Sequence, residues 1–493
     1  MLDFFGALVV IFALYKLTET SRLRHIPTVG WSLPLLSYID AFRVLKHGKD
    51  VLQEGYDKYK NRAFKIAAMD RWWVIITGTE LIEEVRKLPV DKATLGAAFN
   101  EVFQAAYTFG FDLERDTWHI DLIRTQLTRQ IANTFPDMYD EVVSSFRDLI
   151  PANDEWAPIP MVHVMRQIVA RTSSRVFVGP DLARNTEYLN IAINHTIQIS
   201  QARNQFYLLP EILKPLAVPF IVDSGKTFKH AIKLLQPIIE ERTQNLAEYG
   251  DGWVDKPNDM LMWIIETAIS KGQDIDVMAR MVLLTDFAAI HTTTNSFVHA
   301  VYHLAANPEF IQPLREEITA VVQKEGWSKA AMASMKRLDS FLRESQRLNG
   351  ISGTSVMRKS LQDITLSDGT YIPKGTIMAT PVFSTQTDED TYTNPREFEP
   401  FRFSDMREME GESMKHQFSS TSTEYIAFGY GRHACPGRFF AVNEIKAMFA
   451  HLVLTYDVKF KNEGVRPPNK WYGTVFVPEP TVEVLFRKRS GST

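Results

Sequence analysis

The sequence predicts a mainly α-helical protein with small β-sheets, built as one continuous domain behind an N-terminal apolar segment. Three observations lead to this prediction. Most segments carry apolar residues at helical spacing, and one candidate helix over 276–306 contains neither glycine nor proline. No internal repeat and no long Gly/Ser-rich or Pro-rich stretch separates two folding units. With 493 residues, 45% of them apolar, the chain can bury a large core.

The N-terminal segment FFGALVVIFALY, residues 4–15, predicts a membrane anchor. It is shorter than the roughly 20 residues that cross a bilayer, so a helix lying in the interface is the alternative. A cleaved signal peptide would begin with basic residues, whereas this segment is preceded by Asp3, so a cleaved signal peptide is disfavoured. The basic residues that follow favour the cytosolic side for the rest of the chain. We therefore expect an anchor and basic flank over 1–24, one catalytic domain over 25–493, and a location at the endoplasmic reticulum membrane.

Helices and one hairpin are predicted along the chain. Helical periodicity covers Asp137 to Leu149, Phe228 to Glu248 and Met335 to Leu348. The Asp368-Gly369 pair between alternating apolar residues predicts a β-hairpin. The longest helix, from about Asp276 to Ala306, would stop at Asn307-Pro308 and span roughly 45 Å. Its middle reads AAIHTTTNS, and such a polar cluster either bonds back to helix carbonyls or lines a cavity.

Charge and cysteine content exclude several classes of function. The net charge of −4 and the absence of a basic stripe argue against a nucleic-acid partner. Cys435 is the single cysteine, which excludes internal disulfides, zinc sites made of several thiolates and protein-held iron–sulfur clusters. Any thiolate chemistry must use Cys435.

The segment FGYGRHACPGRFF around Cys435 is the strongest candidate site. Its glycines let the backbone approach a flat cofactor and turn N–H groups toward the sulfur, and the helix that follows stabilises a thiolate. A dinucleotide fingerprint, Gly429-x-Gly431-x-x-Ala434, is the rival interpretation, but too little chain follows for the βαβ unit that it requires. A structural cysteine at a strand–helix turn is the other alternative.

This segment resembles the haem-binding loop of the cytochrome P-450 family, the haem-thiolate monooxygenases. Further family motifs occur in the expected order. Glu344-Ser-Gln-Arg347 resembles the Glu-x-x-Arg helix, and FEPFRF resembles the segment that brings Arg402 to that pair. A surface salt bridge is the alternative for Glu344 and Arg347. The positions that fill the loop pattern are Phe428, Gly429, Gly431, His433, Cys435 and Gly437.

The resemblance implies roles for these residues. Cys435 would be the axial thiolate of the haem iron, and Phe428 would pack against the ring. His433 and Arg358 would contact the haem propionates. Trp118 resembles the tryptophan that begins the family's third helix. The arginine expected four residues later is Leu122, so Arg124 is the substitute that we consider.

The segment AAIHTT resembles the family's oxygen-binding groove, and Thr292 fits its hydroxyl position. There Thr292 would hold water for proton delivery. Ala289 replaces the usual glycine and His291 replaces the usual acid. His291 is therefore either a neutral proton shuttle or a structural histidine bonded to a neighbouring helix.

His299-x-x-x-His303 on the same helix has metal-ligand spacing. The residue after the first histidine is Ala300 rather than a glutamate, and no third ligand is evident. A catalytic zinc site is therefore disfavoured, and a serine hydrolase is too, because no Gly-x-Ser-x-Gly occurs.

We expect a monooxygenase that uses O₂ and receives NADPH-derived electrons from a separate flavoprotein reductase, because the family domain leaves no room for a flavin module. Basic residues near Cys435, such as Arg432, Arg438 and Lys446, would suit an acidic partner. The alternatives are a haem-thiolate isomerase or dehydratase that does not use O₂, and a haem sensor or carrier of hydrophobic ligands.

The substrate is expected to be lipophilic. The segment from Ala97 lies where the family has its variable lid, and residues 204–222 lie where it has a membrane-facing access region. IPTVGWSLPLLSY and MKRLDSFLRESQRLNG resemble fungal secondary-metabolism members that act on diterpenoids and triterpenoids, which points to a terpenoid or steroid. The candidate pocket residues are Phe99, Phe103, Tyr107, Phe109, Ala288 and Ala289.

Overall fold

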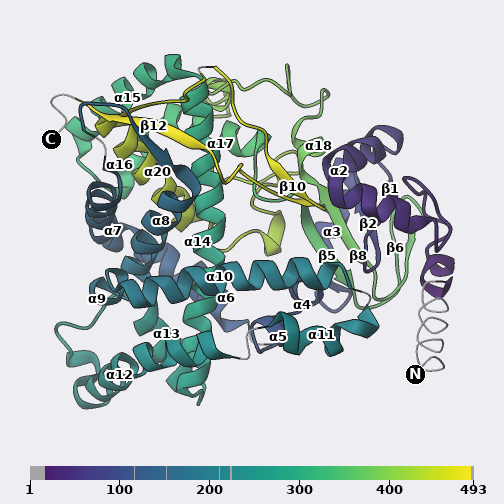
Figure 1. The fold of residues 1–493 in the computed structure, drawn as a ribbon, viewed down its shortest axis with the longest axis horizontal. Coiled ribbons are helices and arrows are strands. Elements are labelled where there is room, and N and C mark those ends of the chain that lie inside the picture. The colour runs from purple at the N-terminus through teal and green to yellow at the C-terminus, as the bar shows by residue number, and fades with distance from the viewer. Residues whose placement is uncertain are drawn as a thin grey trace.

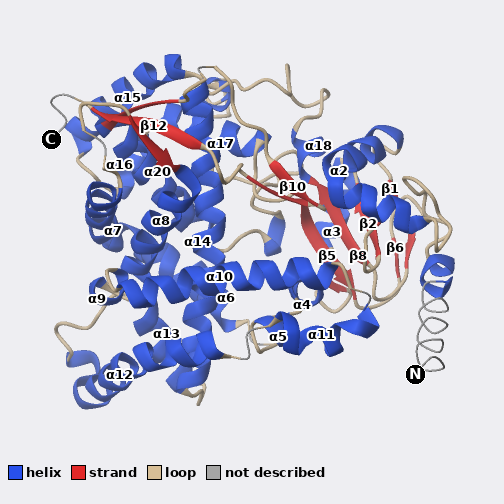
Figure 2. Ribbon diagram, in the orientation of Figure 1, coloured by secondary structure: helices blue, strands red, loops and turns tan. Residues whose placement is uncertain are grey.

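The computed structural model confirms a mainly helical protein with small β-sheets (Figures 1 and 2). One long helix, α14, passes through the middle of the molecule, and α10 crosses it (Figure 1). The largest sheet lies to one side, next to α2 (Figure 2). The structure describes residues 17–115, 117–151, 153–209, 211–222, 225–462 and 464–489.

The helices differ in length from one turn to the 32 residues of α14. They are α2 Ser37–Lys58, α3 Thr79–Lys87, α4 Leu95–Phe103, α5 Ala105–Thr108, α6 Trp118–Leu122, α7 Thr128–Leu149, α8 Met161–Phe177, α9 Pro180–Ala183, α10 Thr186–Tyr207, α11 Lys214–Ile221, α12 Lys226–Tyr249, α13 Met260–Ser270, α14 Ile275–Ala306, α15 Ile311–Glu325, α16 Lys329–Ser334, α17 Lys336–Leu348, α18 Val382–Gln386, α19 Arg402–Met406 and α20 Arg438–Thr455. A π-helical turn η1 covers Ile123–Leu127, and short 3₁₀ turns are η2 Glu211–Leu213, η3 Gly250–Gly252, η4 Pro308–Phe310 and η5 Gly431–His433.

The strands form one five-stranded sheet and three smaller ones. The large sheet has the order β1-β2-β8-β5-β3, in which only the β2–β8 pair is parallel. The others are β4-β12-β9, β10-β11 and β6-β7. The strands are β1 Ala63–Ala67, β2 Trp72–Ile76, β3 Ala93–Thr94, β4 Ala157–Pro160, β5 Thr354–Ser360, β6 Ile364–Thr365, β7 Tyr371–Ile372, β8 Ile377–Pro381, β9 Tyr456–Lys459, β10 Lys470–Tyr472, β11 Val475–Val477 and β12 Glu483–Lys488.

The long helix predicted from the sequence is α14, and its ends have local causes. The Asp274 side chain accepts a hydrogen bond of 3.0 Å from the Val277 N–H and caps the first turn. Asn307 ends the helix ahead of Pro308. Between these ends most residues are buried, as expected of a helix surrounded by others.

The other predicted elements are confirmed, with one different boundary. The helices predicted over 228–248 and 335–348 are α12 and α17. The helix predicted from Asp137 begins at Thr128 and includes Pro136, so the proline does not end it. The predicted hairpin is the β6–β7 pair, where Gly369 has φ +84° and Ile364 faces Ile372.

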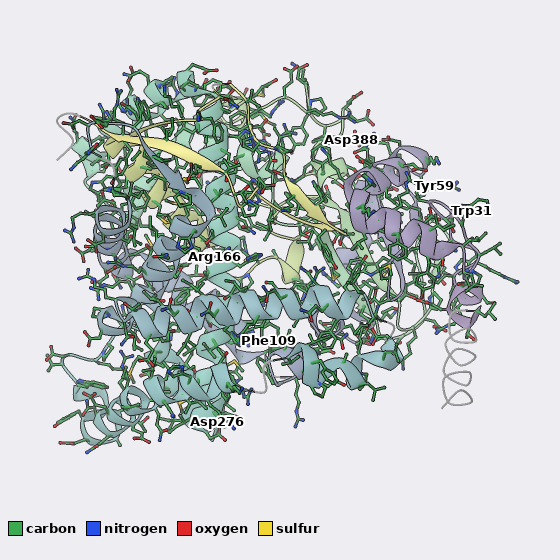
Figure 3. The ribbon with its side chains drawn as sticks, viewed as in Figure 1. Trp31, Tyr59, Phe109, Arg166, Asp276 and Asp388 are labelled. Carbon is green, nitrogen blue, oxygen red and sulfur yellow. The ribbon has the colours of Figure 1, made fainter. Side chains whose placement is uncertain are left out.

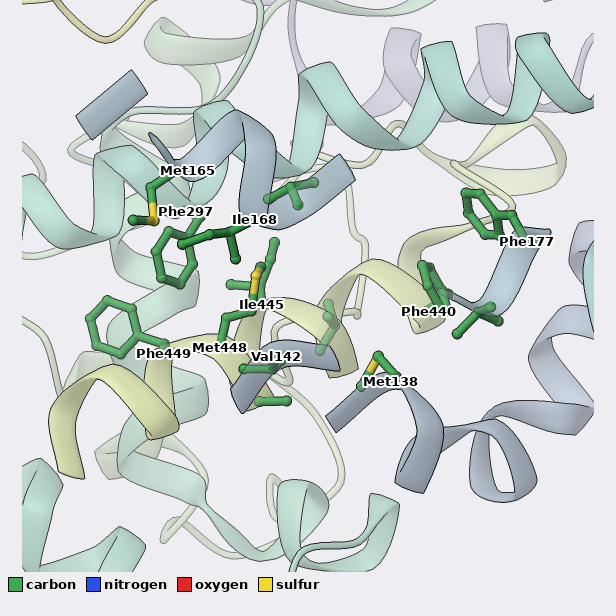
Figure 4. Packing of buried hydrophobic residues seen from close by; sticks show 14 of the residues in the cluster. Met138, Val142, Met165, Ile168, Phe177, Phe297, Phe440, Ile445, Met448 and Phe449 are labelled. Atoms are coloured by element: carbon green, nitrogen blue, oxygen red, sulfur yellow. The ribbon is translucent and has the colours of Figure 1, made fainter. Parts of the chain in front are cut away.

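The main hydrophobic core is centred where α14 and α20 meet. Figure 4 shows Phe297 of α14 packing with Phe449 and Ile445 of α20 and with Ile168 of α8. The rings of Phe297 and Phe449 lie 5.9 Å apart in an edge-to-face arrangement. This packing fixes α20, and therefore the loop that precedes it, against the central helix.

Within the described ranges, no helix is both long and apolar enough to cross a bilayer. The anchor predicted over residues 4–15 lies outside the described residues.

Candidate active site

Cys435 lies at the end of a tight loop, three residues before α20 begins. Its N–H donates a hydrogen bond of 2.7 Å to the Phe428 carbonyl, which folds the loop back on itself. Burial raises the pKa of the thiol, whereas the N–H groups of Gly437 and Arg438 and the charge of Arg438 lower it. The donors that a sulfur anion needs are therefore in place, but a bare thiolate is not stable there. A cation bound to the sulfur would supply the missing stabilisation.

Two glycines in this loop are required by its backbone. Gly429 and Gly431 have φ values of +73° and +71°, a region that other residues rarely adopt. A Cβ on Gly431 would lie 2.2 Å from Cγ of Arg86. The ring of Phe428 lies 5.8 Å from that of Phe418 and is partly buried. Gly437 comes directly before the first residue of α20.

A cluster of basic side chains lies beside this loop. Its hydrogen-bond donors can be compared with the acceptors that a haem would offer. Arg358 is 1% exposed, and its Nη2 has no hydrogen-bond partner among the described residues. The same holds for Nε2 of His433. Burial, followed by the charges of Arg358, Arg432 and Arg124, lowers the pKa of His433 to about 4. Buried donors without acceptors match the two propionates of a haem, which would supply the missing negative charge.

Glu344, Arg347 and Arg402 form the buried network expected from the family motif. Nε and Nη2 of Arg347 each donate a hydrogen bond of 2.7 Å to the Glu344 carboxylate, and neither side chain is exposed. Arg402 reaches Oε1 of Glu344 at 3.3 Å. Arg347 also donates to the carbonyls of Gln386 and Pro395. The network therefore ties α17 to the segment that leads into the cysteine loop.

The middle of α14 has a partly exposed face, although residues 281–286 and 293–306 on either side are buried. Ala288 is exposed, and Ala289, His291 and Thr292 are partly exposed. Because α8, α10, α12, α13, α17 and α20 pack around this helix, the exposed face lines an internal void. The Thr292 hydroxyl donates a hydrogen bond of 2.7 Å to the Ala288 carbonyl and can still accept one from water.

The chain was compared with known proteins. A family model described as Cytochrome P450 matches residues 30–486. The chain is 48% identical over 488 residues to cytochrome P450 monooxygenase 151 of Postia placenta, covering 98% of each chain. It is 38% identical over 497 residues to cytochrome P450 monooxygenase CYP512U6 of Ganoderma lucidum, covering 99% of this chain and 97% of the other.

The chain belongs to the cytochrome P450 family. The fold is that of a solved P450 structure, retinoic acid bound cyanobacterial CYP120A1, with a TM-score of 0.71 at 18% identity over 94% of this chain and 99% of that chain. The protein is therefore a P450 monooxygenase with a cysteine-ligated haem and electrons supplied through a separate reductase. Since Cys435 is the single cysteine, it is the ligand.

Three of the predicted pocket phenylalanines gather on α14 of this P450. The ring centroids of Phe103 and Phe109 lie 5.7 Å and 5.1 Å from that of Phe287, the residue before Ala288. Phe99 lies 5.5 Å from Phe103. Tyr107 packs on Phe206 and lines, together with Phe109, a pocket of about 450 Å³.

The two predicted residues near the start of the third helix have different surroundings. Trp118 begins α6 and packs against the main core. Arg124 lies in the π-helical turn η1 and donates a hydrogen bond to the Arg432 carbonyl. Arg124 thus joins the cationic cluster through the cysteine loop.

One residue expected on a basic docking surface lies elsewhere. Lys446 is 2% exposed and binds Asp339 at 2.8 Å, so that prediction is wrong for this residue. Arg438 is half-buried and donates to the Cys435 carbonyl, whereas Arg432 is exposed.

The two histidines on α14 each bind a side chain from another part of the chain. Nδ1 of His299 lies 2.8 Å from Arg466, and Nε2 of His303 lies 2.8 Å from Asn349. Among the described residues no group of three potential metal ligands is present. The pair instead belongs to a polar cluster that holds the chain before β10 against α14.

Sequence reasoning missed two arginines near the void, Arg166 of α8 and Arg203 of α10. Their charges act on His291. An arginine on an otherwise apolar helix face was the only available signal, and it does not reveal which helix the side chain meets.

Proposed function

We propose that this P450 hydroxylates a lipophilic substrate of terpenoid or steroid type at a membrane. The reaction consumes the substrate, O₂, NADPH and a proton and yields the alcohol, water and NADP⁺. The observation that carries this proposal is the aromatic group formed by Phe99, Phe103, Phe109 and Phe287 beside the exposed face of α14. Such a wall favours a bulky hydrocarbon over a small polar substrate.

The chain's own residues hold the cofactor and direct the chemistry. The haem, when bound, would activate O₂, which supplies the inserted oxygen atom. Cys435 would hold its iron, and Arg358 and His433 would bind its propionates from the cationic cluster. Thr292 would order water at the void and deliver protons from it. The aromatic group would exclude bulk water and orient the hydrocarbon.

Attachment to the membrane of the endoplasmic reticulum, with the catalytic domain in the cytosol, is part of this proposal. Leu216 and Phe220 of α11 are 66% and 89% exposed. The helical residues 17–22 share a pocket with Glu211 of η2, the turn that precedes α11. The apolar run over 4–15 lies directly before residues 17–22 in the sequence. Apolar side chains gathered in this way suit a lipid surface.

Removing residues 1–24 tests the attachment. We expect the truncated protein to be released by alkaline carbonate while its ferrous–CO spectrum stays unchanged. Replacing Leu216 and Phe220 with serine in the truncated protein should remove the remaining vesicle binding. Resistance of the truncated protein to carbonate would show that another segment is the main anchor.

Reconstitution with a P450 reductase tests the reaction. Diterpenes, triterpenes and sterols are supplied in turn, and NADPH consumption, hydrogen peroxide and hydroxylated product are measured. We expect product with at least one polycyclic terpenoid. Conversion without O₂ would support the isomerase or dehydratase alternative. Binding without substrate-dependent NADPH consumption would support a carrier. Turnover of small polar substrates alone would contradict the proposal.

A further inference from the structure

The pocket of about 450 Å³ that Tyr107 and Phe109 line adjoins the aromatic group. Its other walls are α10 between His195 and Gln205, residues 221–228, and Arg280 and Leu283 of α14. In Figure 3, Phe109 lies below α10 and above Asp276, which is in the first turn of α14. The ring centroid of Phe109 also lies 5.1 Å from that of Phe287. The pocket is therefore next to the place where we propose that the hydrocarbon binds.

Arg280 gives this pocket a positive charge. Among the described residues that line it, none is an aspartate or a glutamate. Burial lowers the pKa of His195, the other basic residue of the wall, to about 4, so its imidazole is neutral at pH 7. Arg280 forms no ion pair within the described ranges of the chain. Its charge is therefore available to a ligand.

Contacts from the pocket wall fix the Arg280 guanidinium. Its Nη1 donates a hydrogen bond of 3.0 Å to the Phe109 carbonyl, and the group lies 4.0 Å from the centroid of the Phe228 ring. Gly110 leaves room for it, because a Cβ at that position would lie 2.4 Å from Nη1. A guanidinium held in this way loses less conformational freedom on binding a ligand. None of these contacts neutralises its charge.

α10 adds uncharged amide groups to the same pocket. Gln198, Gln201 and Gln205 line it, and spacings of three and four residues place them on one helix face. The Gln198 Oε1 accepts a hydrogen bond of 3.1 Å from the Thr227 hydroxyl, so its NH₂ group is still a donor. The side chains of Gln201 and Gln205 form no hydrogen bond with other described residues. The pocket therefore offers several donors to an oxygen atom.

Arg280 lies on the face of α14 that carries the aromatic group. Leu283 and Phe287 follow it at spacings of three and seven residues, which share one helix face. Seven residues of helix rise about 10 Å, and the helix between Arg280 and Thr292 rises about 18 Å. A molecule of several fused rings can therefore reach from Arg280 past Phe287 toward Thr292.

We propose that this pocket binds an oxygen-bearing end of the substrate, which accepts hydrogen bonds from Arg280 and from the glutamines of α10, while the hydrocarbon part lies along the Phe287 group. The inference rests on the proposed function and narrows its substrate class to terpenoids or steroids that already carry oxygen. A carboxylate, a ketone and an alcohol share this acceptor chemistry. An earlier reaction must introduce that oxygen, and this enzyme hydroxylates a carbon remote from it.

The test compares matched ligands on the holoenzyme. Abietadiene, abietadienol and abietic acid share one skeleton and differ in a methyl, a hydroxymethyl or a carboxyl group. Cholestane, cholestanol and cholestanone form a second series. Binding is followed by haem absorption and by equilibrium dialysis of labelled ligand. In at least one series we expect an oxygen-bearing member to bind about tenfold more tightly than the hydrocarbon, or better.

Variants assign this preference to the pocket. In Arg280→Met the oxygen-bearing ligand should lose about fivefold or more in affinity, and the affinity for the hydrocarbon should hardly change. Arg280→Lys keeps the charge and should retain part of the preference. Gln198→Leu and Gln205→Leu should each cause a smaller loss. Arg337→Met is the control, because Arg337 also lies over a phenylalanine, Phe401 at 5.6 Å, but is exposed and outside the pocket.

Several results would overturn the inference. Equal binding of all members in both series would do so, as would a preference that is unchanged in Arg280→Met and in both glutamine variants. A new hydroxyl group next to the existing oxygen would contradict the proposed orientation. Haem content and the ferrous–CO band establish that each variant is folded. If Arg280→Met fails to fold, the two glutamine variants decide the question.

The two series also separate the possible ligands and the two proposals. Tighter binding of abietic acid than of abietadienol would support a carboxylate in the pocket, and equal binding of the two would support a neutral oxygen. Turnover of the hydrocarbons with unchanged affinity would leave the proposed function intact and remove the role of the pocket. Binding that depends on Arg280 without any O₂-dependent product would support the pocket and contradict the proposed function.

Discussion

The Glu344 carboxylate accepts two hydrogen bonds of 2.7 Å from the Arg347 guanidinium one turn further along α17, and both side chains are completely buried. The same carboxylate accepts a hydrogen bond of 3.1 Å from the Glu399 N–H. Arg347 donates a hydrogen bond to the Gln386 carbonyl, and the Gln386 side chain donates one of 2.9 Å to the Arg347 carbonyl. Gln386 also accepts from the Ile426 N–H at 3.0 Å. This chain of contacts reaches within two residues of the cysteine loop at Phe428.

Replacing Arg347 with alanine should destabilise the fold and reduce haem content. It leaves the buried Glu344 charge without its main partner, a change that typically costs about 3–5 kcal/mol. Urea unfolding and the ratio of haem to protein measure the effect. Arg487→Ala is the control, because Arg487 forms a partly exposed pair with Asp457 at 3.1 Å and should cost about 1 kcal/mol or less. Equal losses of unfolding free energy in Arg347→Ala and Arg487→Ala would mean that the burial of the Glu344–Arg347 pair does not increase its contribution to stability.

Local rules were sufficient for the fold and for part of the site. The Asp368-Gly369 turn and the length of α14 depend on residues that are neighbours in the sequence. Both could therefore be predicted from the sequence alone. The Glu344 and Arg347 spacing on one helix is a local signal of the same kind.

Other features could not be predicted because they depend on distant parts of the chain. Lys446 is a charged residue of the kind usually found at the surface, yet it is buried and forms an ion pair with Asp339 of α17. The spacing of His299 and His303 suits a metal, but Arg466 binds Nδ1 of His299 and Asn349 binds Nε2 of His303. The action of Arg166 and Arg203 on His291 likewise depends on how α8 and α10 pack against α14.

A partly buried histidine should make the protein sensitive to acid. Burial lowers the pKa of His451 to about 4, and its ring lies 5.1 Å from that of Phe146. In the unfolded chain the pKa is about 6.5. The unfolded state therefore binds more protons between pH 6.5 and 4, and the free energy of unfolding falls as the pH drops through this window. Above pH 6.5 the contribution of His451 is constant.

His451→Phe should reduce this sensitivity, since phenylalanine cannot bind a proton and suits the aromatic site. The free energy of unfolding is measured in urea at pH 7.5 and at pH 5.0. We expect a smaller loss at pH 5.0 than in the wild type, by at most about 1.4 kcal/mol for each pH unit below 6.5. The variant need not match the wild type in stability, because the comparison between the two pH values is made within each protein. An unchanged loss would assign the acid sensitivity to other groups.

Arg71 should restrain the entrance region near α11. Arg71 is 11% exposed and binds Asp70, Glu101 of α4 and Glu211 of η2. The turn between β1 and β2 is thereby tied to both segments, beside a pocket of about 480 Å³. Arg71→Met removes three charged contacts at once. We expect a loss of about 3 kcal/mol, faster amide hydrogen exchange in α4 and α11, and faster substrate association.

The partly exposed pair of Arg43 and Glu54 provides the control for that variant. Arg43→Met should change neither the exchange of α11 nor the association rate. Slower association in Arg71→Met would mean that the contacts guide the substrate rather than hold the entrance closed.

Substitutions of Thr292 and His291 should differ in how they affect the coupling of NADPH consumption to product formation. The Thr292 hydroxyl lies on the partly exposed face of α14 and can order water there. Thr292→Ala should bind haem and substrate normally, yet form at least fivefold less product per NADPH and release more hydrogen peroxide. Thr292→Ser keeps the hydroxyl and should stay close to the wild type. Unchanged coupling in Thr292→Ala would remove this hydroxyl from proton delivery.

His291 is neutral at pH 7, because its pKa is about 4, so well under 1% of it carries a proton to donate. We therefore expect His291→Ala to keep its coupling and to alter substrate binding instead, because His291 lies on the partly exposed face of α14. If the imidazole relays protons together with Thr292, His291→Ala should lower coupling as much as Thr292→Ala. The double variant should then be little worse than either single one, because linked steps are not additive. NADPH consumed, hydrogen peroxide released and product formed in the reconstituted enzyme distinguish these two outcomes.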